Sequence, residues 1–319
     1  MVFIYEKAVK GRKYLYLMKS IRLPDGRVTN IQKIIGKKGS PEKLWKKHRE
    51  FFIQKEKEAY ANFALRNYKT NLVFSAYQIS KIEGMRVNYK HLLKGFSKEQ
   101  YRDVFDRFTA NFTYESNAIE GSSLTLKDVS IVMFENRSPE GKDLREIWET
   151  RNSREVMDKI LKGKFKLTEK GIVKMHKMLM KNIDSRIGYK QFPNEILGST
   201  TELTPPEKVS YEMGNLIEWH EKNPQKLHPL QMSALFHGKF ERIHPFADGN
   251  GRVGRFIVTA ILANGGYPPI IIRKTQRTAY IKAIEDFQRG YTVNLERLFL
   301  EKYKGTYEKF FETYAKYIK

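Results

Sequence analysis

Apolar residues recur at three- and four-residue spacing through most of the chain after Pro41. This is the period of an α-helix that buries one face. Ser97 has the character of an N-cap, and Tyr101, Val104 and Phe108 follow it at helical spacing. Other helices are predicted at 42–68, 142–161, 168–182, 205–223, 229–241, 249–264, 275–289 and from 294 toward the C-terminus. Because strands and helices do not alternate, the sequence predicts a mainly α-helical body.

Two segments depart from the helical period. Residues 2–36 alternate apolar and polar positions around the turn signal Pro24-Asp25-Gly26, which predicts a small three-stranded meander. Between Ile187 and Thr204 the helical period lapses, so an exposed loop or hairpin is predicted there.

The charge balance points to an anionic partner. The net charge is +23, and residues 1–57 hold 16 basic but only 5 acidic residues. A nucleotide, a nucleic acid or an acidic protein fits this balance, while a lysine-rich surface that only aids solubility is the alternative. The chain has no cysteine, so disulfides and thiolate metal sites are excluded. Without a signal peptide or an apolar run of about 20 residues, we expect a cytoplasmic location and no membrane partner.

The densest cluster of chemical groups lies at 243–256, with the sequence I-H-P-F-A-D-G-N-G-R-V-G-R-F. Gly249-Asn250-Gly251 precedes a helical run. The free N–H groups of a helix start bind anions, and glycine lets a phosphate approach the backbone. Arg252 and Arg255 are three residues apart, so their guanidinium groups can clamp two phosphates.

Two further groups in this cluster suit the chemistry of a transferase. Asp248 is a lone carboxylate beside the glycines, which is typical of a residue that holds Mg²⁺ through substrate oxygens. His244 can take a proton from an incoming hydroxyl. The segment 249–254 also matches G-x-G-x-x-G, but no apolar strand precedes it, so a dinucleotide-binding fold is excluded. These residues indicate a nucleotide-handling transferase.

Residues 244–255 resemble the signature of Fic-domain (Fido) proteins, H-P-F-x-[DE]-G-N-G-R-x-x-R, without departure. The flanking strings Leu227-His228-Pro229 and 266–270 are also similar to the family, and the resemblance extends loosely back to about Phe74. It implies a Fic-type helical bundle with a β-hairpin flap. The implied organisation is a meander at 1–40, a helical region at 41–165, the Fic core at 166–302 and a C-terminal helix at 303–319.

The resemblance implies protein AMPylation. Such a nucleotidyltransferase binds ATP with Mg²⁺ or Mn²⁺ and transfers AMP to a Tyr, Thr or Ser hydroxyl of a target protein. It implies that His244 is the general base and that Asp248 holds the metal, with Arg255 toward the γ-phosphate. The implied nucleotide-binding residues are Asp248, Gly249, Asn250, Gly251, Arg252, Val253, Gly254, Arg255, Leu197, Gly198, Ser199, Thr200 and Tyr280.

The segment at about 187–204 resembles the family's flap, which would hold the target by main-chain hydrogen bonds. Many members enter the flap with G-x-[YF]-R, whereas this chain has Gly188-Tyr189-Lys190-Gln191. The aromatic is displaced and the arginine is missing, so the register of the flap is open. An ordinary surface loop here, and a core-packing role for Tyr280, are the alternatives.

A second motif, Ser116 to Gly121, reads S-N-A-I-E-G. It resembles the inhibitory helix of one class of the same family, here at about 113–121. The resemblance implies that Ser116 braces the segment and that Glu120 pairs with Arg255 in place of a γ-phosphate. It also leaves open that Glu120 positions a water for AMP removal, as in a deAMPylase or bifunctional enzyme. The plain alternative is a helix end with Gly121 at C′.

Aromatic and basic residues also alternate in the N-terminal meander, as in Gly11-Arg12-Lys13-Tyr14-Leu15-Tyr16. This segment resembles short N-terminal segments of some prokaryotic transposase-like proteins. A nucleic-acid-associated regulator is therefore a second hypothesis. Packing on the helical body, or a contact within a homodimer, is the alternative. The sequence does not identify the target protein or its modified residue.

Overall fold

The computed structural model describes residues 2–36, 39–194 and 202–314. The chain divides into two compact units, Met1–His91 and Leu92–Lys319. Among the described residues, none of the helices combines the length and the apolar character that crossing a bilayer requires.

The first unit begins with the predicted meander, which the structure confirms. The strands β1 (Val2–Val9), β2 (Arg12–Arg22) and β3 (Val28–Ile35) form an antiparallel sheet in the order β1-β2-β3. Lys10 and Gly11 form the first turn with positive φ angles of 48° and 76°, which is the geometry of a two-residue hairpin. This explains the glycine between the two strands.

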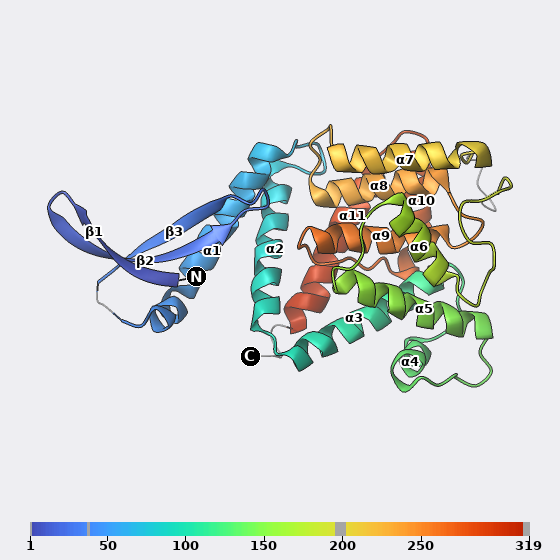
Figure 1. The fold of residues 1–319 in the computed structure, drawn as a ribbon, viewed down its shortest axis with the longest axis horizontal. Coiled ribbons are helices and arrows are strands. Elements are labelled where there is room, and N and C mark those ends of the chain that lie inside the picture. The colour runs from blue at the N-terminus through green and yellow to red at the C-terminus, as the bar shows by residue number, and fades with distance from the viewer. Residues whose placement is uncertain (1, 37–38, 195–201, 315–319) are drawn as a thin grey trace. The chain divides into compact units, whose positions relative to one another are not determined.

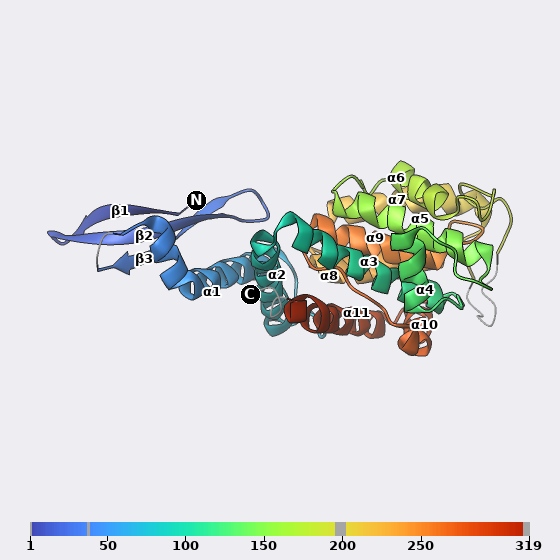
Figure 2. The same cartoon turned by 90° about the horizontal axis from the view of Figure 1, so that it is seen from below.

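The helices α1 (Pro41–Asn67) and α2 (Ala76–Gly95) complete the first unit. One face of the sheet is buried against α1 (Figure 2), and Val87 of α2 belongs to the same core. The buried residues of this core are Leu17, Ile21, Ile31, Ile35, Phe52, Tyr60 and Val87. The sequence prediction omitted α2. Its buried residues Ile79, Ile82, Val87 and Tyr89 combine helical with alternating spacing, which weakens the helical signal.

The second unit is a helical bundle, and it confirms the prediction of a mainly α-helical body. Its helix α9 (Asn250–Asn264) is buried at every position from Arg252 to Leu262 and lies among α3, α5, α6 and α8 (Figure 1). The other helices are α3 (Lys98–Ile119), α4 (Leu126–Ser130), α5 (Leu144–Leu161), α6 (Glu169–Leu179), α7 (Pro206–Lys222), α8 (Pro229–Ile243), α10 (Arg277–Gln288) and α11 (Val293–Thr306), with short turns at Ile131–Glu135, Lys274–Gln276 and Tyr307–Glu312.

Helix α3 starts where the sequence predicts it. The Ser97 side chain accepts a hydrogen bond from the Gln100 N–H, and the Gln100 side chain accepts one from the Ser97 N–H, which forms a capping box. The helix continues to Ile119 and therefore includes Ser116.

The segment predicted as a loop or hairpin contains bends and residues without regular secondary structure over its described parts, 187–194 and 202–204. Leu197, Gly198, Ser199 and Thr200, which the resemblance places against the nucleotide, lie outside the described residues.

Candidate active site

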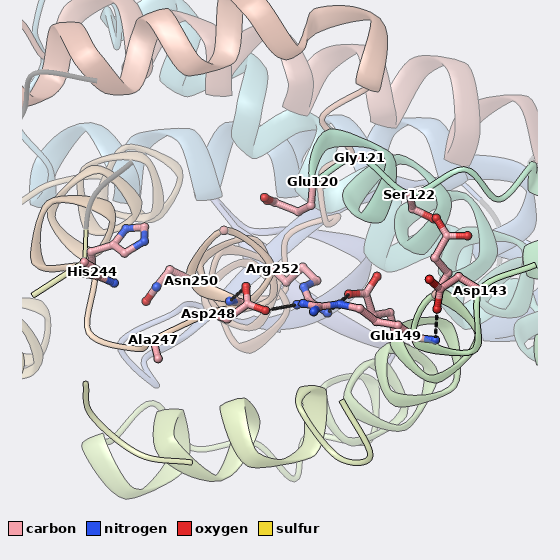
Figure 3. Close-up of a pocket in the computed structure, with 15 residues that line it drawn as sticks. Glu120, Gly121, Ser122, Asp143, Glu149, His244, Ala247, Asp248, Asn250 and Arg252 are labelled. Atoms are coloured by element: carbon pink, nitrogen blue, oxygen red, sulfur yellow. Dashed lines mark hydrogen bonds and ion pairs between the residues drawn. The ribbon is translucent and has the colours of Figure 1, made fainter. Parts of the chain in front are cut away.

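A cavity of about 540 Å³ opens at the N-terminus of α9 (Figure 3). Its volume is in the range of small-molecule sites. The end of α3, the start of α5 and the turn between α8 and α9 form its walls. The residues that line it are Glu120, Gly121, Ser122, Asp143, Arg145, Glu146, Glu149, Asn194, His244, Ala247, Asp248, Gly249, Asn250, Gly251 and Arg252.

The turn between α8 and α9 is held in shape by its own side chains. The Asn250 amide donates to the Phe246 carbonyl at 2.8 Å and accepts from the Phe246 N–H at 2.9 Å. His176 of α6 stacks on the Phe246 ring at 3.9 Å, and its Nε2 lies 3.1 Å from the Asp248 carbonyl. Gly249 has a φ of +79°, which an L side chain would strain. The Asn250 side chain therefore shapes the turn. We expect the backbone of this turn, and not the Asn250 side chain, to contact an anion.

His244 ends α8 in the left-handed region, with a φ of +47°, and this turn brings its side chain to the cavity. Burial, and next the positive charge of Lys190, lower the pKa of His244 to about 4. Its Nδ1 lies 3.8 Å from a carboxylate oxygen of Glu241, one helical turn earlier. Burial raises the pKa of Glu241 to about 8. At neutral pH the imidazole is therefore uncharged and can accept a proton.

An NMR titration of the His244 ring should show this lowered pKa. A lowered pKa means that the ring stays neutral as pH falls and becomes protonated only near pH 4. We expect the ring signals of His244 to stay those of neutral imidazole from pH 8 to about pH 5.5. In Lys190→Gln the midpoint should rise only slightly, because burial is the larger cause. A wild-type midpoint near 6.5 would contradict the buried environment.

Arg255 lies one turn into α9, and its guanidinium group is held by residues at the end of α3. Its Nη2 lies 2.7 Å from Glu120 Oε1 and 2.9 Å from the Ser116 carbonyl, and its Nε donates to Ser116 Oγ at 2.9 Å. The Glu120 carboxylate also lies directly over Gly251, where an added Cβ would collide with it. Since Gly251 is in the first turn of α9, a carboxylate occupies the anion-binding end of this helix.

The position of Glu120 is set by the way α3 ends. Glu120 is the C-cap, and Gly121 follows with a φ of +104°. The Gly121 N–H bonds to the Ala118 carbonyl and the Ser122 N–H to the Asn117 carbonyl, which is a complete Schellman motif. Arg277 of α10 donates to the Ile119 carbonyl at 2.8 Å. The segment is a helix end and also directs Glu120 into the cavity (Figure 3).

On the α5 side, two arginines and two carboxylates form a network of ion pairs. Arg145 Nη2 pairs with Asp248 Oδ2, and its Nε lies 3.2 Å from Glu149 Oε1. Arg252 Nη1 lies 3.1 Å from the same Glu149 oxygen, and Arg252 Nη2 lies 3.8 Å from Asp248. Arg252 is 3% exposed, whereas Arg145 is 51% exposed. Arg252 and Arg255 thus contact opposite walls, α5 and α3.

Comparison with known proteins supports the family resemblance. Residues 166–262 match the model of the Fic/DOC family. The matched residues include the whole signature at 244–255. The "Protein adenylyltransferase Fic" of Nematostella vectensis is 29% identical over 182 residues, which are 56% of this chain and 43% of that protein. The protein of the same name from Drosophila virilis is 32% identical over 171 residues, 52% of this chain and 35% of that protein. The chain therefore spans less than half the length of these relatives.

Solved structures show the same fold. A Fic domain containing signaling protein from Bacteroides thetaiotaomicron VPI-5482 superposes with a TM-score of 0.66 at 23% identity, over 75% of this chain and 98% of that one. A Fic family protein from Desulfovibrio desulfuricans G20 has a TM-score of 0.62 at 25% identity, over 77% of this chain and 76% of that one.

Four candidate residues of the Fic domain and its flank lie behind the cavity wall. Val253 and Gly254 are buried, and a Cβ on Gly254 would lie 2.8 Å from the His237 ring. Tyr280 is 1% exposed, and its hydroxyl lies 2.7 Å from His237 Nε2 and 3.4 Å from Arg255 Nη1. These residues, with the buried Arg255, pack and orient the groups that face the cavity.

Sequence reasoning missed Arg145, Glu149 and Lys190. Lys190 is 4% exposed; its Nζ donates to Asn194 Oδ1 at 2.6 Å and its N–H to the Pro245 carbonyl at 2.9 Å. The only signal for Lys190 was its place in the string at 188–191, which departs from the family pattern G-x-[YF]-R. Arg145 and Glu149 are an ordinary i,i+4 pair in the sequence, which is typical of a solvated helix face.

Proposed function

We propose that this chain is a protein adenylyltransferase that transfers AMP from ATP to a hydroxyl side chain of a target protein. The observation that carries the proposal is one cavity that joins a neutral buried imidazole, His244, to the N-terminus of α9 at Gly249-Asn250-Gly251 and to a carboxylate, Asp248. The curated relatives are named as protein adenylyltransferases, which supports the same chemistry.

In this reaction the target hydroxyl attacks the α-phosphate of ATP. A bond forms between the hydroxyl oxygen and phosphorus, and the bond to the β-phosphate oxygen breaks, which releases pyrophosphate. The His244 imidazole takes the hydroxyl proton and later returns it to solvent. The backbone of Gly249, Asn250 and Gly251 orients the phosphates, so positioning and charge neutralisation supply most of the rate.

The cavity fits a divalent cation such as Mg²⁺ or Mn²⁺ that is carried by the nucleotide. Among the described residues, no group of three or more His, Asp or Glu side chains is placed to hold a metal ion. Asp248 places one carboxylate directly before the Gly249-Asn250-Gly251 turn, with 35% of its side chain exposed. Mg²⁺ is typically bound by one or two carboxylates together with phosphate oxygens and waters. When bound, such a cation neutralises phosphate charge.

We propose that Glu120 restrains this reaction. Its carboxylate pairs with Arg255 and lies over Gly251, so it takes an anion position that a phosphate needs. In this arrangement a triphosphate meets a negative charge where it requires a positive one. Ser116 supports the restraint, because it fixes the Arg255 guanidinium through both its hydroxyl and its carbonyl.

The target protein would approach beside the segment at 187–204. Its described part runs along the His244 loop, since the Lys190 N–H donates to the Pro245 carbonyl and the Asn194 amide donates to the Phe246 carbonyl. Phe192 is 80% exposed next to this contact, so it offers an apolar group to a bound chain.

Mass spectrometry of cell lysate tests the proposed function. Glu120→Gly protein is incubated in the lysate with isotope-labelled ATP and Mg²⁺, and tryptic peptides are searched for the added mass of AMP. We expect labelled Tyr, Thr or Ser residues on at least one protein, including the enzyme itself. The matched control is the Glu120→Gly/His244→Ala double variant, which lacks the base. Absence of AMP peptides with Glu120→Gly, or equal labelling with the double variant, would contradict AMP transfer.

A further inference from the structure

A second site of the molecule lies far from this chemistry in the sequence, on the sheet of the first unit. Side chains of a strand alternate between its two faces, so the register of the sheet divides its residues into two sets. One set is the core covered by α1 and α2. We call the other set the open face. Its residues are Phe3, Tyr5, Lys7, Val9, Arg12, Tyr14, Tyr16, Met18, Ser20, Arg22, Val28, Asn30, Gln32 and Ile34.

The contacts on the open face confirm that these residues share one side. The Tyr5 ring stacks on the Tyr16 ring with centroids 5.2 Å apart, and Phe3 lies 6.4 Å from Tyr5. The Tyr5 hydroxyl donates to Gln32 Oε1 at 2.6 Å across the sheet. Ser20 Oγ donates to Asn30 Oδ1 in the same way. None of the open-face residues belongs to the core under α1 and α2.

The open face carries many apolar and aromatic side chains, where a protein surface is normally polar. Val28 and Ile34 are each 57% exposed and Val9 is 38% exposed, and four aromatic rings lie among them. In an antiparallel sheet with one buried face, the face that meets solvent usually carries polar residues. Exposed apolar patches of this kind mark interaction surfaces.

The positive charge of the open face indicates which class of partner it binds. It carries three cations, Lys7, Arg12 and Arg22, and no acidic residue. Within the described residues, none of the three forms an ion pair. The whole unit holds 21 basic and 7 acidic residues in positions 1–91, a net charge of +14 out of +23. A protein partner through an apolar face does not require this excess, whereas a phosphate backbone does.

We propose that the open face binds single-stranded nucleic acid. Aromatic side chains on an exposed sheet stack against unpaired bases, which is sequence-tolerant because every base has a π-face. Phe3, Tyr5 and Tyr16 supply a row of rings for two or three bases. Lys7, Arg12 and Arg22 surround the row and contact the backbone phosphates. A duplex keeps its bases stacked inside, so it cannot use the rings.

Fluorescence anisotropy of labelled oligonucleotides tests this site with the full chain. The probes are a dT oligonucleotide of about 12 residues, its RNA equivalent and a duplex of equal length, at about 50 mM and 200 mM salt. We expect binding to both single strands, weaker at high salt, and at least about tenfold weaker binding to the duplex. His244→Ala should bind unchanged, so failure of the proposed transferase activity would leave this result intact.

Two variants with matched controls locate the site. Tyr5→Thr/Tyr16→Thr removes the central rings but keeps strand-favouring residues, and should weaken single-strand binding by about tenfold or more. Its control is Tyr77→Ala, an aromatic that is 71% exposed on α2. Lys7→Ser/Arg12→Ser/Arg22→Ser should lower the salt slope by about two. Its control is Lys43→Ser/Lys46→Ser/Arg49→Ser, which removes three exposed cations from α1. Circular dichroism confirms the fold of each variant.

Several results would overturn the proposal. Equal affinity for the duplex, or equal losses in each variant and its control, would show that general charge attraction explains binding. Absence of binding at about 50 mM salt would exclude the site. A dimer in light scattering that Ile34→Lys dissociates would show that a second copy of the chain covers the open face instead.

Discussion

Glu120→Gly should transfer AMP to itself and to target protein at least about tenfold faster than the wild-type chain. A charge-assisted hydrogen bond contributes about 1.5–3 kcal/mol. The Glu120 carboxylate is 44% exposed, so solvent screening reduces the Glu120–Arg255 pair to about 1–2 kcal/mol. Displacing this pair alone accounts for a factor of about ten. The observed gain should be larger if Glu120 in the wild-type chain also forces the triphosphate into an unproductive orientation.

Initial rates with labelled ATP measure this gain. Glu120→Gln keeps the size of the side chain but removes its charge, so its rate should fall between those of wild type and Glu120→Gly. The Glu120→Gly/Arg255→Ala variant should lose the gain, because the cation that Glu120 neutralises, and that the γ-phosphate would contact in its place, is then removed. Equal rates for wild type and Glu120→Gly would show that the carboxylate does not restrain the enzyme.

The same variants separate restraint from AMP removal. Glu120 and His244 line one cavity, so a Glu120 carboxylate that orients water could also serve hydrolysis. Target protein labelled by Glu120→Gly, then purified and mixed with wild type, would lose AMP over time only if Glu120 has this second role. Stable labelling would restrict Glu120 to restraint.

Residues close in sequence were the ones that could be placed from sequence. The glycines at 249 and 251 and the apolar run after them predicted a loop that opens a helix, and α9 begins at Asn250. The meander was predictable because alternation and the turn signal Pro24-Asp25-Gly26 are local in the sequence. Glu120 and Arg255 are 135 residues apart, and their pairing was suggested only by the family resemblance.

Contacts that depend on helix packing could not be predicted. Arg145 lies 103 residues before Asp248, and neither residue carries a signal of the other. The sequence suggested that Arg252 and Arg255 clamp phosphates side by side, but at three-residue spacing they contact different neighbours, α5 and α3. Burial decides these contacts, because α9 is enclosed on nearly all sides and each cation must find a carboxylate.

The second large effect should come from Arg145, which we expect to bind phosphate once nucleotide enters. Its side chain is 51% exposed at the cavity, and its present partner Asp248 is 35% exposed. An exposed pair of this kind contributes about 0–1 kcal/mol to stability. A charge-assisted bond to a phosphate contributes about 1.5–3 kcal/mol. The phosphate contact therefore outweighs the ion pair, and nucleotide binding should move Arg145 from Asp248 to the triphosphate.

In the Glu120→Gly background, Arg145→Ala should weaken ATP binding by about tenfold, measured by titration calorimetry in excess EDTA. The metal-free condition isolates the phosphate contact from any effect of a free Asp248 on cation binding. The matched control is Arg137→Ala, which removes an arginine that is 76% exposed and lies outside the cavity. With Mn²⁺ alone, Arg145→Ala should instead bind the ion more tightly, because Asp248 loses its competing cation. Unchanged ATP affinity with tighter Mn²⁺ binding would show that Arg145 only blocks Asp248 and does not contact the nucleotide.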